Sequence, residues 1–324
     1  MRFVSIPNQG ASWRESLIYS FSTETSDPQD VTVEVVDARS SELLGEMRLY
    51  GVTRGMVNVA PYVARRASLM PPSGGRGLEV VKSPSAMAVV VRINGVSSEE
   101  RIFFRSAFNP DLSKALSYCS DNQEVEEGDV IRLTLYAKRE IWITVTYSRG
   151  VNLQPVSATT MCDGLPVELM LSTDGLRSGD VVSLTVRYDQ GDAQSVRFTV
   201  MSKRMSSKRL LWYNPYGGVE CYTFGHSTRI GYGVEVQSVD GGSGEGRRVV
   251  EGELRYRLCS GQEGRNELER VAELLLSPAV YKCSGMQSEQ VNVVSREVAF
   301  DGKGELHNMT LEVCEEWKGG GLLW

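Results

Sequence analysis

Residues 208–224 read KRLLWYNPYGGVECYTF and decide how the last third of the chain folds. Two apolar and aromatic runs flank an Asn-Pro-x-Gly-Gly segment, in which proline fixes its own φ and glycine tolerates a positive φ. We therefore predict a β-hairpin, with one strand ending at Trp212-Tyr213, a turn over 214–218 and a returning strand through Phe224. Alternate rings are expected to enter the core of the last domain, while the others cover the joint with the preceding domain.

Strand patterns also dominate the rest of the chain. Runs rich in β-branched and aromatic residues occur at 31–38, 85–93, 129–137, 141–147, 180–188, 195–201 and 252–258. Asn94-Gly95 and Asp240-Gly241 have the composition of tight hairpin turns, and the loose segment 241–248 is typical of a hairpin tip. Short strands between turns indicate a mainly β protein built of sandwiches, and the missing crossover helices argue against a parallel α/β fold.

One amphipathic helix is expected near the C-terminus, at about 265–277. Leu268, Val271 and Leu275 recur at helical spacing, and Ser277-Pro278 ends the pattern. Because this stripe must pack against a sheet, the last domain is predicted to be an α+β module with one helix on an antiparallel sheet.

Linker-like segments along the chain predict several domains. The segments 70–77 (MPPSGGRG) and 202–209 (SKRMSSKR) have the composition of linkers. We expect the following division: an N-terminal β domain over 1–70, a β-sandwich unit over 78–140, a second β-sandwich unit over 141–204 and a C-terminal β domain with the helix over 205–324.

A Gly-Asp turn feeds a similar strand twice, at 128–135 and again at 179–186. The repetition indicates either two related small sandwich units or one sandwich with a repeated hairpin. A chance match stays open, because Gly-Asp before a strand is common.

Composition limits the partners. The chain has 324 residues and a formal net charge of −6, which argues against duplex nucleic acid as a partner. The basic run from Lys203 to Arg209 is interpreted as a solvated linker. No apolar stretch has the length of a signal peptide or a membrane span, so we expect a protein kept in the cytoplasm or carried in an assembly.

Catalytic and metal-binding patterns are missing from the sequence. His226 precedes Ser227, but adjacent strand residues point to opposite faces and cannot form a catalytic pair, so His226 and His307 are interpreted as surface or structural residues. No Gly-x-Ser-x-Gly or phosphate-loop motif occurs. We predict no catalytic, cofactor-binding or metal-binding residue, and hence no enzyme and no cofactor. The aromatic residues allow an alternative, a sugar-stacking platform, although core packing is the preferred interpretation. The candidate platform residues are Trp13, Trp142, Trp212, Tyr213, Tyr216, Tyr222 and Trp317.

The segment from Arg209 to Phe224 resembles a motif of tail-region structural proteins from bacteriophages and prophages of Bacteroides-type bacteria. The motif has the form Arg-Leu-x-Trp-x-Asn-x-x-Gly-Gly-x-x-x-Tyr-Thr-Phe, and the matching positions are Arg209, Leu210, Trp212, Asn214, Gly217, Gly218, Tyr222, Thr223 and Phe224. The resemblance is firmest over 205–317 and weaker over 1–67, where LGEMRLYGVTRGMVNVAPYVARRA (44–67) matches. The chain departs from the pattern at 287–290, where Gln-Ser-Glu-Gln replaces the expected tryptophan or apolar residue.

The resemblance implies a structural subunit of a tail or baseplate-like assembly. Such a subunit would be assembled in the bacterial cytoplasm without a signal peptide, would reside in a virion or tail-like particle and would contact other subunits, including copies of itself. Its structural-motif or interface candidates are Arg209, Trp212, Asn214, Gly217, Gly218, Tyr222 and Phe224. The alternative is an adhesin that binds a carbohydrate or cell surface, with a host-surface glycan as partner.

Overall fold

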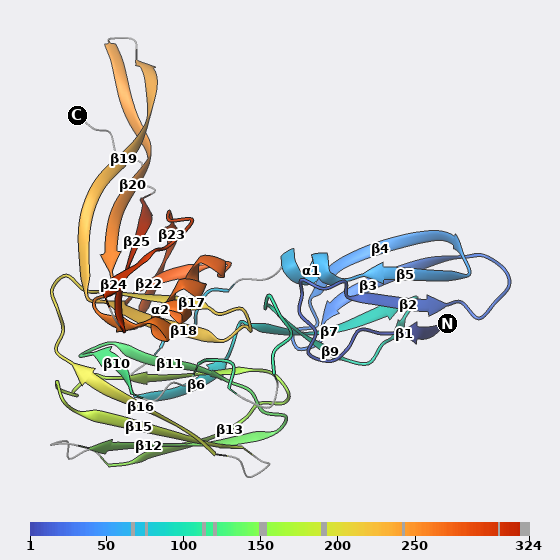
Figure 1. Cartoon of the computed structure of the whole chain (residues 1–324). Helices are drawn as coiled ribbons and strands as arrows, with labels where there is room; N and C mark the ends of the chain where they lie inside the picture. The colour runs from blue at the N-terminus through green and yellow to red at the C-terminus, as the bar shows by residue number, and fades with distance from the viewer. Residues whose placement is uncertain are drawn as a thin grey trace.

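The computed structural model describes residues 1–65, 69–74, 77–111, 115–118, 122–148, 154–188, 193–241, 244–303 and 305–317. Strands predominate, and within these ranges helix is confined to α1 (Ala60–Arg65), α2 (Arg265–Ala272) and the 3-10 turn η1 (Glu273–Leu276). Figure 1 shows the strands gathered into several packed β units. The predicted fold class, mainly β with multiple sandwiches, is therefore confirmed. No helix in this part of the chain is both long and apolar enough to cross a membrane.

The N-terminal unit packs two antiparallel sheets around a core that includes Tyr19, Val33 and Val91. One sheet contains β1 (Arg2–Ser5), β2 (Ile18–Ser22) and β5 (Arg54–Asn58). The other contains β3 (Gln29–Asp37), β4 (Leu43–Val52), β7 (Ala86–Ile93), β8 (Val96–Ser97) and β9 (Arg101–Phe104). Asn94 and Gly95 have φ of 46° and 84°, so the predicted type I′ turn between β7 and β8 is confirmed.

The middle unit is one sandwich with a single core. Its five-stranded sheet has the order β10 (Gln123–Glu126), β16 (Ala193–Met201), β15 (Val181–Tyr188), β12 (Glu140–Ser148) and β13 (Val156–Met161). Its three-stranded sheet has the order β11 (Val130–Leu135), β14 (Val167–Ser172) and β6 (Leu78–Lys82). Apolar side chains from both sheets, such as Leu133 and Val182, meet in that core.

The C-terminal unit is built on a nine-stranded sheet. Its strands are β17 (Lys208–Tyr213), β18 (Val219–Phe224), β19 (His226–Gly241), β20 (Gly244–Cys259), β21 (Glu263–Gly264), β22 (Val280–Ser284), β23 (Gln287–Val293), β24 (Phe300–Lys303) and β25 (Leu306–Trp317). The predicted helix is present as α2 and η1, and its Leu268, Val271 and Leu274 are buried in the core of this unit.

The strand pairing differs from the predicted domain division at two boundaries. Strand β7, expected in the unit 78–140, pairs with β3 of the N-terminal unit. Strand β6 instead pairs with β14, and residues on both sides of the predicted boundary at 140 share one core. The reason is that strands pair with partners distant in sequence, whereas linker composition is a local signal.

The repeated Gly-Asp turn falls within the single middle sandwich. Gly128 and Gly179 both have positive φ, 77° and 90°, and feed β11 and β15 of opposite sheets. This placement favours one sandwich with a repeated turn over two related units.

The long hairpin of β19 and β20 is confirmed, but its ladder runs further than predicted. Asp240 pairs with Glu245 and Gly241 pairs with Gly244, so the tight turn predicted at Asp240-Gly241 is wrong and most of the segment expected as a loose tip belongs to the strands. The turn itself, at 242–243, lies outside the described residues.

Candidate functional site

The turn between β17 and β18 is built around Asn214. Its main-chain N–H donates to the Gly218 carbonyl at 2.8 Å, and the Gly217 N–H donates back to the Asn214 carbonyl at 2.9 Å. The Asn214 Oδ1 accepts the N–H groups of Tyr216 and Gly218, at 3.0 and 2.9 Å. Gly217 has a φ of 86°, a conformation that glycine adopts without strain. The predicted hairpin is thus present, and its turn is closed by its own side chain and main chain.

The N-terminal unit contacts the outer side of this turn. The N–H groups of Ala107 and Phe108 donate to the Pro215 carbonyl at 2.7 and 3.1 Å. The rings of Phe108 and Tyr216 lie with their centroids 5.9 Å apart. The segment after β9 is therefore attached to the hairpin of the last unit.

The middle unit contacts the inner side of the same turn. The Asn214 Nδ2 donates to the Leu116 carbonyl at 2.8 Å, and the Ser117 Oγ donates to the Val219 carbonyl at 2.5 Å. The Val219 N–H donates to Thr134 Oγ1 at 2.8 Å. Strand β18 ends the strand order of its sheet, and these bonds satisfy part of its edge. The turn and β18 are consequently the place where all three units meet, which we call the joint.

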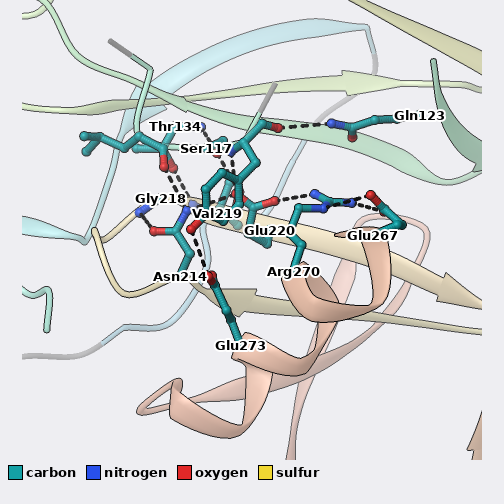
Figure 2. A network of polar contacts seen from close by, with 12 residues as sticks. Ser117, Gln123, Thr134, Asn214, Gly218, Val219, Glu220, Glu267, Arg270 and Glu273 are labelled. Atoms are coloured by element: carbon teal, nitrogen blue, oxygen red, sulfur yellow. Dashed lines mark hydrogen bonds and ion pairs between the residues drawn. The ribbon is translucent and has the colours of Figure 1, made fainter. Parts of the chain in front are cut away.

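A buried carboxylate extends the joint to the helix (Figure 2). The Glu220 Oε1 accepts the Tyr118 N–H at 2.6 Å and Asn214 Nδ2 at 3.0 Å. Its Oε2 accepts Arg270 Nη1 at 2.8 Å, and Arg270 also pairs with Glu267. Helix α2 is thereby connected through Glu220 both to the turn and to the segment 115–118 of the middle unit.

The 3-10 turn η1 adds one more bond to this network. Tyr118 Oη donates to Glu273 Oε1 at 3.0 Å, while Gln123 Nε2 donates to the Tyr118 carbonyl at 3.1 Å. The side chain of Tyr118 therefore connects the middle unit to the end of the C-terminal helix.

Burial raises the pKa of Glu220 to about 7, because loss of hydration outweighs the attraction of Arg270 and the hydrogen bonds from Tyr118 and Asn214. Glu220 is 3% exposed. Between about pH 4.5 and pH 7, the folded chain therefore holds a proton at Glu220 that the unfolded chain has already released.

We expect the Glu220 contribution to stability to be complete below pH 4.5 and to be lost as the pH rises through about 7, since the folded pKa is the higher one. The loss should be about 3 kcal/mol between these limits. Urea denaturation at pH 5 and pH 8 measures it. Glu220→Gln serves as the comparison, because it removes this titration and leaves that of the other buried carboxyl groups. Identical pH profiles for the two proteins would contradict the assignment.

Two further buried ion pairs lie where the middle unit faces the C-terminal unit, the first within the middle unit and the second between the two units. Arg132 Nη1 donates to Glu168 Oε1 at 2.7 Å, with both side chains almost fully buried. Arg209 Nη1 lies 3.8 Å from Asp129 Oδ2 and donates to Thr223 Oγ1 at 2.8 Å. These contacts explain why β11 is buried along its whole length: one face lines the sandwich core and the other faces the C-terminal sheet.

The basic run was predicted to be a solvated linker, and for Arg209 this is wrong, since its side chain is buried beside Asp129. Arg204 is half exposed and donates to Glu126 Oε1 at 2.7 Å. Both arginines contact acidic groups of the middle unit, because the chain folds back along β10 and β11 there.

The predicted interface candidates divide between two surfaces of the hairpin. Trp212, Tyr222 and Phe224 enter the core of the C-terminal unit, where Tyr222 and Phe224 pack edge to face at 5.0 Å. Leu211 and Tyr213 lie on the other side with Leu69 and Tyr281. Arg209, Asn214, Gly217 and Gly218 contact the neighbouring units. The expected alternation of rings between core and joint is present.

The structure does not assemble the aromatic residues into one platform. Trp212 and Tyr213 are fully buried, and Trp13 packs against the N-terminal core. Trp142 lies on β12 of the middle unit, far along the chain from the hairpin. The side chain of Trp317 lies outside the described residues. A shared sugar platform made of these rings is therefore wrong.

A polar cleft of about 300 Å³ lies beside the joint, between β10, β18 and α2. It is lined by acidic and basic side chains that already pair, such as Arg204 with Glu126 and Arg270 with Glu267. Among the described residues no group of three or more histidine, cysteine and carboxylate side chains is arranged to hold a metal ion. The groups at the joint are arranged to fix three units relative to one another.

Sequence reasoning missed Glu220, Arg270, Arg132 and Glu168. A signal for three of them was present, since each is a charged residue inside an apolar strand: VECYTF, VIRLTL and VELMLS. A charge at such a position requires a partner.

Comparisons with known proteins find weak similarity to solved structures. No family model matches the chain, and no curated protein matches it. Among solved structures, the Ig1 and Ig2 domains of DIP-gamma match with 14% identity over 63% of this chain and 97% of theirs, at a TM-score of 0.17. A complex of Dpr2 Ig1–Ig2 with DIP-Theta Ig1–Ig3 matches with 13% identity over 62% of this chain and 99% of that chain, at a TM-score of 0.19. Scores this low carry no inference about function.

Proposed function

We propose that the chain is a non-enzymatic structural subunit of a phage or prophage tail or baseplate-like assembly from Bacteroides-type bacteria. It acts through packed β units that hold a docking arm in a fixed direction, and its partners are other subunits of the particle, including copies of itself. The proposal rests on the motif at 209–224 and, in the structure, on the projecting hairpin of β19 and β20.

This hairpin extends beyond the sheet that anchors it (Figure 1). Strand β20 pairs with β25 from Gly252 to Cys259, whereas 244–251 pair only with β19 among the described residues. Strand β19 ends the strand order, so its outer edge has no partner strand in the described part of the chain. We call residues 235–241 and 244–251 the arm.

A two-stranded ribbon without a third strand or a packed face has little stability of its own in water. An open strand edge is also a ready template for a strand from another chain. Both properties favour an arm that is completed by a neighbouring subunit. The contacts of the joint support the same interpretation. The Arg209–Asp129 pair and the bonds between Asn214 and Leu116 hold the unit that carries the arm against the middle unit, and the bonds to the Pro215 carbonyl hold it against the N-terminal unit.

Deletion of the arm is expected to leave the strand pairing at its base intact. Replacing residues 235–251 by Asn-Gly keeps the pairing of Val234 with Gly252 and of β20 with β25. The shortened chain is expected to melt within about 2 °C of the native chain, because the pairing of β19 with β20 from His226 and Cys259 to Val234 and Gly252 is retained. It should be lost from purified particles, as measured by quantitative mass spectrometry, whereas the native chain co-purifies in fixed ratio to other structural proteins.

Gly231→Ala is the matched control, since it lies at the base of the arm with open space around it. It should enter particles normally. Native protein found solely as a free monomer would refute the assembly role, and normal incorporation of the shortened chain would refute the role of the arm.

A further inference from the structure

No described helix or strand covers the outer face of the five-stranded sheet of the middle unit, on the side away from the C-terminal unit (Figure 1). Along β12, Ile141, Ile143 and Val145 point into the sandwich core, so Trp142, Thr144 and Thr146 lie on the outer face. The indole of Trp142 is 41% exposed there. Trp142 was one of the candidate platform residues, but the fully buried Trp212 and Tyr213 cannot share this face with it.

The register places mostly hydroxyl side chains around this indole. Trp142 has Thr159 on one side and Arg187 on the other. The next row along β12 contains Ser157, Thr144, Thr185 and Ser195, and the following row contains Thr146, Ser183 and Arg197. The face is therefore flat and polar, with one exposed ring.

A shallow hollow of about 410 Å³ lies on this face. Its polar lining comes from Asn122, Ser183, Thr185, Ser195 and Arg197. Within the hollow, the hydroxyl groups of Thr185 and Ser195 lie 3.0 Å apart. Arg197 and Arg187 have no ion-pair partner among the described residues, so the described part of this face presents two unpaired guanidinium groups, together with the carboxylate of Glu140 at the far end of β12.

These groups match the chemistry of an acidic sugar chain. An exposed indole offers an apolar face for the C–H side of a pyranose ring, while hydroxyl side chains exchange hydrogen bonds with sugar hydroxyls. A guanidinium binds a carboxylate through two parallel hydrogen bonds. Trp142 and Arg197 are separated by two strand spacings, about 10 Å, and by four residues along the strands, about 13 Å, which suits an oligosaccharide better than a single sugar.

We propose that this face of the middle unit binds an oligosaccharide that contains uronic acids, with Trp142 stacking on one sugar and Arg197 holding a carboxylate. The proposal is independent of the assembly role. A protein partner is less favoured, since the rows beside Trp142 hold serine and threonine in place of large apolar side chains. Polyphosphate chains are less favoured because they offer no apolar C–H face on which the Trp142 indole could stack.

Isothermal titration of the full chain with oligogalacturonate, oligomannuronate and hyaluronan oligosaccharides tests the proposal. At least one is expected to bind and to quench tryptophan fluorescence, and Trp142→Ala and Arg197→Gln should each weaken that binding at least tenfold. Trp142→Phe should restore part of the affinity, because it retains an aromatic face.

Tyr50→Ala is the matched control, since Tyr50 is an exposed aromatic residue on β4 of the N-terminal unit. It should leave binding unchanged, and thermal melting checks that all variants are folded. A neutral maltooligosaccharide should bind more weakly than the acidic probes. The proposal is overturned if no acidic probe binds, or if inorganic polyphosphate binds as well as the sugars and does so independently of Trp142.

Discussion

Gly218→Ala is expected to lower the free energy of unfolding by about 3 kcal/mol, which corresponds to about 6 °C in melting temperature. A Cβ atom at this position would lie 2.1 Å from the Leu116 carbonyl oxygen and 2.5 Å from the Ser117 nitrogen. Both are main-chain atoms, so the clash cannot be relieved by rotating a side chain. Because Gly218 has no positive φ, the expected effect comes from the contact alone.

The contact that would be broken is the joint itself. Moving Leu116 away from Gly218 also stretches the bond from Asn214 Nδ2 to the Leu116 carbonyl and the bond from Ser117 Oγ to the Val219 carbonyl. Thermal melting and urea denaturation of Gly218→Ala measure the loss. Gly231→Ala, which meets nothing within 4 Å, should melt like the native chain. Equal melting curves for the two variants would contradict close packing at the joint.

The hairpin was predictable because its signals are local. The turn composition, the alternation of rings and the two flanking strands all lie between Lys208 and Phe224. The same holds for the Asn94-Gly95 turn and for the C-terminal helix, each of which depends on neighbours within a few residues. Propensity and periodicity suffice for elements of this kind.

The division into units was not predictable from the same signals. Strand β6 pairs with β14, and strand β10 pairs in parallel with β16. The partners are so far apart in the sequence that the composition of a linker gives no information about their pairing. The joint follows from those pairings, since Leu116 and Asn214 are brought together only when the sandwich and the C-terminal sheet have formed.

The exposure of Trp142 follows from the alternation of side chains along its strand, once the residues that face the core are known. In the segment IWITVTY, the isoleucines and the valine occupy the core, which leaves the tryptophan on the other face. Counting aromatic residues without this assignment grouped Trp142 with Trp212, although one ring is exposed and the other is fully buried.

Arg270→Met is expected to lower the free energy of unfolding at pH 8 by about 3–5 kcal/mol, the usual effect of removing one partner from a buried ion pair. Arg270 Nη1 contacts Glu220 Oε2 at 2.8 Å, and the two side chains are 11% and 3% exposed. Without the guanidinium, the Glu220 carboxylate would keep only the Tyr118 N–H and the Asn214 amide as donors. Urea denaturation measures the change.

The double variant Arg270→Met with Glu220→Gln separates the pair from simple packing. It should recover part of the stability, because a neutral amide needs no cation, and the recovered amount is the coupling energy of a double-mutant cycle. Arg265→Met is the matched control on the same helix, since its pair with Glu269 is exposed and should contribute only about 0.5 kcal/mol.

The loss of stability in Arg270→Met should also be smaller at pH 5 than at pH 8. At pH 5 Glu220 is protonated in the folded chain, since its pKa there is about 7. A loss no larger than that of Arg265→Met, or one equal at both pH values, would mean that Arg270 does not compensate a buried carboxylate at the joint.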